Sequence, residues 1–161
     1  MKKFLKEYVP YIVILVLVIL TRTFLITPVK VNGSSMDKTL KSGDIMLLYK
    51  QANIDREDIV VIDKAVQGSN IIKRIIGMPG ETIKCEDGII YINNKVYNDK
   101  YAYGETNDFK EVTLSNDEYF VLGDNRMVSQ DSRYFGSVKE KYIEGQTSII
   151  IYPFNKIGKV S

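Results

Sequence analysis

Apolar residues form one long, almost unbroken run near the N-terminus. The run covers residues 9–20 and resumes at 24–26 after a short polar interruption. A transmembrane helix needs about 20 mainly apolar residues, so the segment 8–26 can span a bilayer if Arg22 extends toward the interface. Three lysines precede the run, and such charges favour the cytoplasmic side. We therefore expect one transmembrane helix that ends before Pro28, with its N-terminus in the cytoplasm.

Two other interpretations of this apolar run compete with a membrane anchor. A buried core helix would normally show a polar face, and this run has none. A cleaved signal peptide would share the basic start and the apolar stretch, but no small-residue cleavage pattern follows. We favour an uncleaved anchor at the cell membrane, residues 1–28, that holds an extracytoplasmic domain of residues 29–161.

Beyond the anchor, apolar residues fall into short runs between turn signals. Several short strands at close spacing are typical of an antiparallel β barrel or sandwich, so we expect a mainly β domain. Asp87-Gly88 and Asn93-Asn94 lie between such runs and predict tight hairpin turns. The polar stretch 98–110 predicts an exposed loop whose tyrosines serve packing. The expected strands cover residues 45–49, 59–62, 71–76, 82–85, 89–92, 95–97, 119–122 and 147–152.

Composition narrows the class of function. The chain of 161 residues has a formal net charge of +2, one cysteine and no histidine. The small net charge argues against a dedicated nucleic-acid-binding protein. The absence of histidine excludes a Ser-His-Asp triad, and the acidic residues lack the spacing of an EF-hand, so we expect no metal. A hydrolase of this composition would use lysine, a carboxylate or a metal-bound water as its base.

The segment Gly33-Ser34-Ser35-Met36 follows the anchor closely. Glycine permits a tight turn, and a serine after such a turn can expose its hydroxyl beside free backbone N–H groups. These are the parts of an acyl-transfer site. On turn chemistry alone, however, an ordinary loop is the commoner explanation of this motif.

A lysine interrupts the apolar strand expected at 71–76. Strict alternation places Lys73 on the same face as Ile71 and Ile75. If that face is buried, burial lowers the pKa of Lys73, which a lysine base requires because the usual pKa is about 10.4. The alternative is that Lys73 and Arg74 lie at an exposed sheet edge.

A dense polar loop at 123–133 follows an expected strand directly. Its side chains can orient a site through hydrogen bonds, or they can only pair to hold a turn. Without histidine, the hydrolase mechanism that uses all three segments is a Ser-Lys dyad. Ser35 would attack a carbonyl, and neutral Lys73 would accept its proton and later protonate the leaving amine.

Together these segments resemble the bacterial type I signal peptidases, specifically the short Gram-positive-like form. The resemblance begins with the anchor. The later residues that carry it are 33–36, 39–40, 42–45, 73–80, 123–136 and 152–158, in that order. It implies the antiparallel, LexA-like β fold of that family and removal of signal peptides from exported preproteins at the outer leaflet. It further implies cleavage after small residues, with preprotein signal peptides and membrane lipid as partners, no nucleic acid, no cofactor and a monomer.

By position, the resemblance assigns Ser35 as the nucleophile and Lys73 as the general base. The main chain of Gly33 and Ser34, chiefly with the Ser35 N–H, would form the oxyanion site. Ser129 would help to orient the lysine, and Met36 would line the substrate cleft. The residues expected to shape or support the site are Asp124, Asn125, Arg126, Asp131, Ser132 and Arg133.

The chain departs from the family pattern at Lys38, where a proline normally rigidifies the turn after the nucleophile. Met127-Val128 also replaces a more polar pair. Two other functions stay open: a pilus assembly factor with little or no proteolysis, and a self-cleaving regulator with the same dyad. Retention of Ser35 and Lys73 speaks against the first, and a membrane helix in place of a DNA-binding module speaks against the second.

Overall fold

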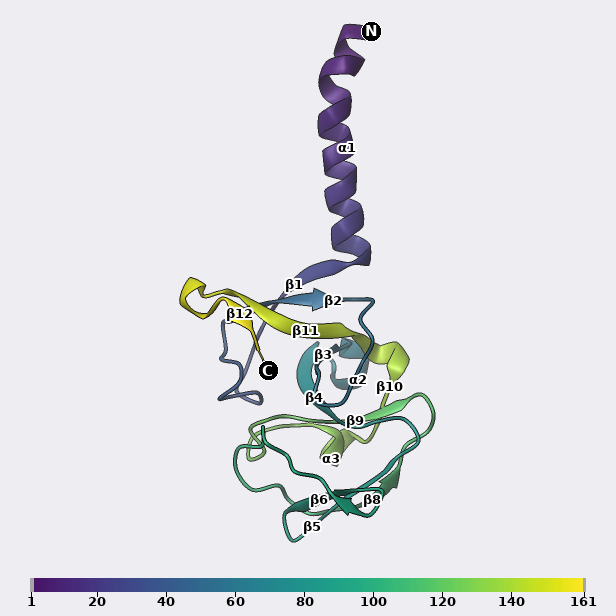
Figure 1. Ribbon diagram of the computed structural model, residues 1–161, viewed down its shortest axis with the longest axis vertical. Coiled ribbons are helices and arrows are strands. Elements are labelled where there is room, and N and C mark those ends of the chain that lie inside the picture. The colour runs from purple at the N-terminus through teal and green to yellow at the C-terminus, as the bar shows by residue number, and fades with distance from the viewer. Residues whose placement is uncertain (1, 161) are drawn as a thin grey trace.

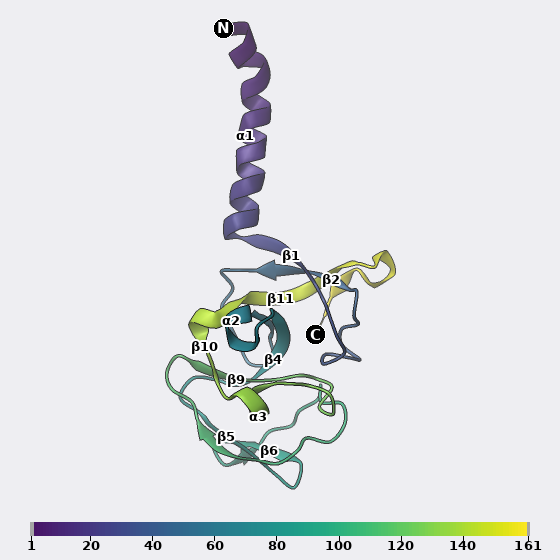
Figure 2. The same ribbon diagram turned by 180° about the vertical axis from the view of Figure 1, so that it is seen from behind.

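The computed structural model describes residues 2–160, with side chains described from residue 7 onward. One long helix, α1 (Lys2–Phe24), projects from a β domain (Figures 1 and 2). The apolar window Glu7–Phe24 is long enough to cross a membrane, and none of it is buried in the protein. The helix ends before Pro28, as expected. An apolar helix whose residues are not buried in the protein has the character of a membrane span rather than a core helix.

The β domain contains twelve strands within the described residues. They are β1 (Ile26–Lys30), β2 (Ile45–Tyr49), β3 (Ile59–Ile62), β4 (Ile71–Gly77), β5 (Thr82–Glu86), β6 (Ile89–Ile92), β7 (Lys95–Val96), β8 (Phe109–Thr113), β9 (Glu118–Leu122), β10 (Val138–Lys139), β11 (Ile143–Tyr152) and β12 (Gly158–Lys159). Short helices lie at α2 (Lys64–Gln67) and α3 (Ser132–Phe135), and single 3-10 turns at η1 (Glu140–Tyr142) and η2 (Phe154–Lys156).

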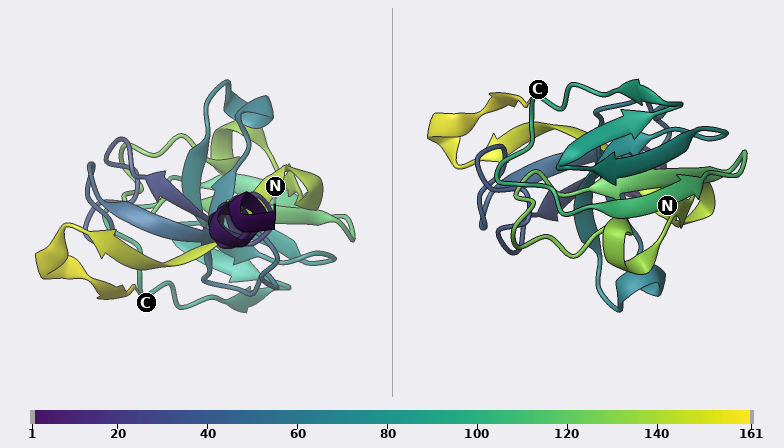
Figure 3. Two further views of the ribbon diagram at one scale, coloured as in Figure 1. Left: turned by 90° about the horizontal axis from the view of Figure 1, so that it is seen from above. Right: turned by 90° about the horizontal axis from the view of Figure 1, so that it is seen from below.

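These strands form two antiparallel sheets. The larger sheet has the order β1-β2-β11-β3-β4-β9-β10, with β12 paired to β11, and the smaller has the order β7-β6-β5-β8. The smaller sheet lies at the end of the molecule farthest from α1 (Figure 1). Viewed along α1, the helix stands over the β domain (Figure 3, left). The prediction of a mainly β, antiparallel domain after one apolar helix is confirmed.

Each expected strand is present, and both hairpin turns form where predicted. Asp87, Asn93 and Asn94 all have positive φ, as the favoured two-residue hairpin turns require. The expected loop at 98–110 is wrong at its end, because β8 begins at Phe109 and pairs with β5. Phe109 stacks on Phe120 of β9 with ring centroids 5.0 Å apart. This contact between sheets draws Phe109 out of the polar stretch and into the core.

Strand β4 occupies an interior position, between β3 and β9. Lys73 and Arg74, in the middle of this strand, are 3% and 2% exposed. The alternative of an exposed sheet edge is therefore excluded for these two cations. A separate core cluster packs beneath the loop that follows β1 and fixes it against the larger sheet; its members are Val31, Met36, Leu40, Met46, Ile59 and Ile150.

Candidate active site

Ser35 and Lys73 meet at the larger sheet. Ser35 lies in the loop between β1 and β2, Lys73 is the third residue of β4, and Ser35 Oγ and Lys73 Nζ are 2.8 Å apart. Ser35 is partly exposed, whereas Lys73 is buried. A hydroxyl at hydrogen-bond distance from an amine, with access to solvent on one side, is the arrangement of a nucleophile and its base.

The loop between β1 and β2 exposes Ser35 because different features hold the residues before and after it. Gly33 has φ +88°, a left-handed conformation that glycine adopts without steric cost. Met36 and Leu40 are 2% and 0% exposed and anchor the following turn in the core, where the Leu40 N–H donates to the Met36 carbonyl at 2.8 Å. Ser35 therefore stands between a flexible glycine and a buried methionine, with its hydroxyl outside the core.

Burial lowers the pKa of Lys73 from 10.5 to about 8. Desolvation is the largest cause, because an ammonium loses hydration in an apolar environment. The charge of Asp131 opposes the shift, Arg133 adds to it, and Asp124 opposes it. A substantial fraction of Lys73 is therefore neutral near pH 8 and can accept a proton.

The loop after β9 holds the nucleophile loop from the other side. The Asn125 N–H donates to the Ser35 carbonyl at 2.9 Å, and Asn125 Nδ2 donates to the Ser34 carbonyl at 3.2 Å. Within residues 2–160 the Ser35 N–H has no hydrogen-bond partner. This backbone donor is free to bind an oxygen that develops negative charge beside Ser35.

Arg74 connects β4 to the loop between β1 and β2 and to the loop after β9. Its guanidinium binds Asp124 in two bonds of 2.8 and 2.7 Å, and Asp124 Oδ2 also accepts from Thr39 Oγ1 at 2.5 Å. The ring of Tyr101 lies 3.6 Å from the guanidinium carbon of Arg74. Neither Thr39 nor Tyr101 stands out in the sequence as a site residue, because each joins the site only through the buried pair of Arg74 and Asp124.

The remaining support residues form a second buried network. Asp131 accepts from the Gly123 N–H at 3.1 Å and pairs with Arg133 at 2.8 Å. Ser132 Oγ accepts from the Val121 N–H at 2.9 Å, while Arg126 Nε donates to the Gly123 carbonyl. The structure thus brings all the expected support residues together at the end of β9, where they fix the loop rather than contact Ser35 Oγ.

Ser129 lies in the loop after β9 and is buried. Its Oγ is buried and has no hydrogen-bond partner within residues 2–160, Lys73 included. The side chain instead packs against the backbone of Gly123, where an added Cβ would lie 2.6 Å from Ser129 Cβ. Orientation of Lys73 by Ser129 stays a prediction.

A small cleft of about 170 Å³ opens beside the Ser35–Lys73 pair. Met36 forms part of its wall, and its other lining residues are Val31, Asn32, Gly33, Ser35, Ser69, Asn70, Ile71, Ile72 and Lys73. The small volume and the buried Met36 and Val31 in the wall suit a short side chain. Among the described residues no group of three or more Cys, Asp or Glu side chains could hold a metal ion.

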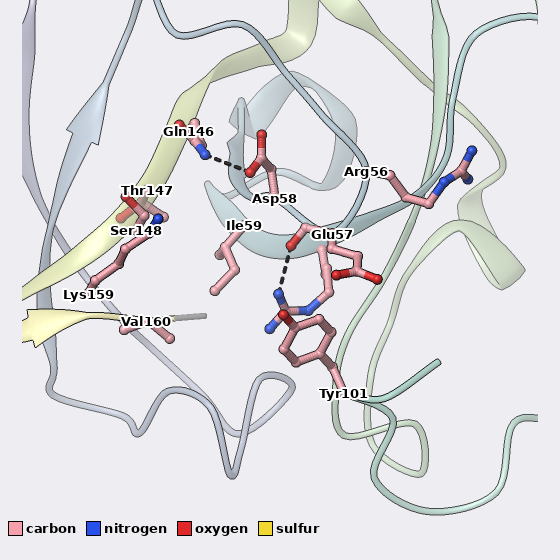
Figure 4. Close-up of a pocket in the computed structure, with 11 residues that line it drawn as sticks. Arg56, Glu57, Asp58, Ile59, Tyr101, Gln146, Thr147, Ser148, Lys159 and Val160 are labelled. Atoms are coloured by element: carbon pink, nitrogen blue, oxygen red, sulfur yellow. Dashed lines mark hydrogen bonds between the residues drawn. The ribbon is translucent and has the colours of Figure 1, made fainter. Parts of the chain in front are cut away.

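A second cleft, of about 230 Å³, is lined by Arg74 of β4, and Figure 4 shows it with Tyr101 and Gln146 among its labelled side chains. Neither Ser35 nor Lys73 is among its lining residues. Its polar groups bond to one another; for example, Gln146 Nε2 donates to Asp58 at 2.6 Å. Arg74 and Tyr101 are both part of its lining.

Comparison with known proteins identifies the class. The family model described as signal peptidase, peptidase S26, matches residues 4–152. Signal peptidase I of Bacillus licheniformis is 38% identical, covering 98% of this chain and 94% of the relative. Signal peptidase I of Streptococcus pneumoniae serotype 4 is 34% identical, covering 98% and 97%. The crystal structure of a signal peptidase I from Enterococcus faecalis is 36% identical, with a TM-score of 0.53, and covers 59% of this chain and 97% of that one.

These matches define the protein as a serine-protease hydrolase with an antiparallel β fold. The chain belongs to the signal peptidase family, peptidase S26, and its relatives are type I signal peptidases, which act on the signal peptides of preproteins. The resemblance inferred from the motifs is therefore confirmed, and the pilus assembly factor is not favoured. The apolar N-terminal helix is consistent with membrane anchoring.

Proposed function

We propose that this chain is a membrane-bound endopeptidase that removes N-terminal signal peptides from exported preproteins, with Ser35 as nucleophile and Lys73 as general base. The observation that carries the proposal is the 2.8 Å distance between Ser35 Oγ and Lys73 Nζ. The pKa of Lys73 near 8 supports the same roles, because a general base works best when its pKa lies near the working pH.

The steps follow from the positions of three groups. Neutral Lys73 accepts the proton of the Ser35 hydroxyl while Oγ attacks the carbonyl carbon of the scissile peptide bond. The oxygen of the tetrahedral intermediate accepts a hydrogen bond from the Ser35 N–H. Protonated Lys73 then donates its proton to the leaving amine, which is the N-terminus of the mature protein. In the second half, Lys73 accepts a proton from the water that attacks the acyl-enzyme carbonyl, and it returns that proton to Ser35 Oγ as the ester bond breaks.

The cleft beside Ser35 supports the proposal that cleavage follows small residues. Its volume of about 170 Å³ leaves room for short side chains, and the buried thioether of Met36 closes one wall. Gly33 allows close approach of the substrate backbone because it has no side chain. The main chain of Ser34 is held by Asn125, which keeps the oxyanion donor in a fixed position.

The anchor sets where this reaction takes place. We propose a single-pass protein of the cell membrane in which residues 1–28 comprise the cytoplasmic N-terminus and the anchor, and residues 29–161 form the extracytoplasmic catalytic domain. Strand β1 (Ile26–Lys30) crosses this boundary and joins the two parts. The catalytic domain acts as a monomer on signal peptides at the lipid surface and has no nucleic-acid partner.

The test uses the full-length protein in detergent with a preprotein that carries an Ala-x-Ala cleavage site. We expect Ser35→Ala and Lys73→Ala each to lower kcat/KM by about 10³-fold or more, as loss of a nucleophile or its base does. Ser115→Ala and Lys95→Ala, two exposed positions outside the site, serve as controls and retain activity. Normal cleavage by either site variant would show that the dyad is assigned to the wrong residues.

A further inference from the structure

Three exposed side chains, which come from loops near Ser35, form a surface. Lys38 follows Ser35 by three residues, and its Nζ lies 3.8 Å from the centroid of the Tyr103 ring. Tyr103 is 43% exposed and Met127 is 70% exposed. We call Lys38, Tyr103 and Met127 the loop-side surface. It presents one cation and two apolar groups, and a cation over an aromatic face is held there electrostatically.

The loop-side surface is connected to the nucleophile through a short chain of backbone contacts. The Tyr103 N–H donates to the Asp124 carbonyl at 2.7 Å, and the Arg126 N–H donates to the Tyr103 carbonyl at 2.9 Å. Asn125 lies between Asp124 and Arg126 in the chain, and its N–H donates to the Ser35 carbonyl. Tyr103 is therefore fixed relative to Ser35 by backbone hydrogen bonds rather than by a flexible side chain.

Met127 is held on the same surface by Gly104. An added Cβ at Gly104 would lie 2.7 Å from Met127 Cγ, so the methionine packs directly on the glycine backbone. Gly104 also has φ +80°, a conformation that residues with a side chain adopt only with strain. The surface therefore has a defined shape next to the site, even though its side chains are exposed.

The cleft of the active site is separate from this surface. None of its lining residues belongs to the loop-side surface. A substrate whose small residues occupy the cleft runs past Ser35 and can continue over the loop-side surface. The residues that leave on that side are the first residues of the mature protein, since they follow the scissile bond.

Lys38 has a backbone conformation that proline, the residue common at this position in the family, cannot adopt. Its φ is +77°, whereas proline is fixed near −65°, so proline could not form this turn. Within residues 2–160 no carboxylate lies within ion-pair distance of Lys38 Nζ. The ammonium is thus available to an acidic side chain that a substrate brings.

We propose that the loop-side surface binds the first residues of the mature segment and that Lys38 favours acidic side chains there. This inference rests on the proposed function of the same site. One partly exposed ion pair is worth a preference of about three- to fivefold in kcat/KM. The preference weakens at high salt, because exposed charges are screened.

The experiment compares three preproteins that share one Ala-x-Ala site and differ only at the second and third residues after the bond, which are Glu, Ser or Lys. With the full-length wild-type protein at low salt we expect the Glu preprotein to exceed the Lys preprotein about three- to fivefold in kcat/KM. Lys38→Met brings the ratio close to one, and Lys38→Glu reverses it. Lys95→Met, an exposed lysine on β7, keeps the wild-type ratio and is the matched control.

A binding measurement separates this inference from the proposed function. The Ser35→Ala protein, with and without Lys38→Glu, is titrated with the same three preproteins and the dissociation constants are compared. Charge-dependent binding that Lys38→Glu reverses supports the loop-side surface even if cleavage is not observed, an outcome that would count only against the catalytic roles. Equal ratios for wild type and Lys38→Glu in both measurements overturn the inference.

Discussion

Lys73 is a buried cation whose environment favours its neutral form. Since burial lowers its pKa to about 8, the amine is protonated and inactive as a base well below pH 8 and neutral above it. We therefore predict that kcat/KM rises about tenfold per pH unit on the acid side, as expected for one required deprotonation, and levels off above pH 8. Steady-state cleavage of one preprotein between pH 6 and 10 measures this profile.

The pH at which kcat/KM reaches half of its maximum distinguishes a buried Lys73 from an exposed one. A half-maximal rate near pH 10.5 would mean that the lysine keeps the pKa of an exposed amine, and a flat profile would remove it from the proton transfer. Thermal unfolding over the same pH range is the control, because it separates loss of the folded protein from loss of the base.

At the scale of elements, the loop after β9 determines where the nucleophile stands. Gly123 lies so close to the nucleophile loop that an added Cβ would be 2.6 Å from the Ser35 carbonyl oxygen. A backbone atom cannot move aside as a flexible side chain can, so Gly123→Ala has to displace Ser35 or the loop. We predict a loss of about 10²-fold in kcat/KM, which is the cost of a misplacement of about 1 Å at a catalytic site. Cleavage assays on the full-length variant test this.

Gln130→Ala is the matched control for this loop, because Gln130 is exposed and adds no atom near Ser35. It is expected to keep wild-type kcat/KM. Undiminished activity of Gly123→Ala would mean that the contact between Gly123 and Ser35 does not limit the position of the nucleophile.

Strands with a clear apolar pattern could be predicted from the sequence, while those formed by pairing could not. Strands β2 to β6 carry apolar runs bounded by turn residues. Strand β1 contains Pro28, and β8 is largely exposed, so neither has a pattern that local propensity recognises. Both exist because a partner strand supplies their hydrogen bonds: β1 pairs with β2, and β8 pairs with β5.

The residues of the candidate site likewise divide into those that could be predicted from the sequence and those that could not. Ser35 and Lys73 could be proposed from residue chemistry, because a serine after a turn and a lysine in an apolar strand are unusual on their own. Burial of Arg74 depends on Asp124, which lies 50 residues further along the chain, and no local pattern encodes such a contact. Thr39 and Tyr101 join the site through that ion pair and were therefore missed.

At the scale of the molecule, the helix and the β domain are joined with almost no linker. Helix α1 ends at Phe24 and β1 begins at Ile26. Lys50, just after β2, binds both sides of this junction: its N–H donates to the Leu25 carbonyl at 3.0 Å, and its Nζ donates to the Thr23 carbonyl at 2.9 Å. Such a short connection keeps the catalytic domain close to any membrane that α1 spans.

This arrangement predicts that the anchor acts on substrate encounter rather than on the chemistry. A chain of residues 25–161 retains all of β1 and every residue of the Ser35 cleft. We expect it to cleave a soluble peptide with kcat/KM within about threefold of the full-length protein, but to cleave a preprotein in lipid vesicles about 10²-fold more slowly, because tethering raises effective concentration. Parallel assays with the full-length protein in the same vesicles provide the reference. Equal rates on the vesicle-bound preprotein would show that α1 contributes nothing to encounter, and a parallel loss on the soluble peptide would show that α1 supports the fold of the site.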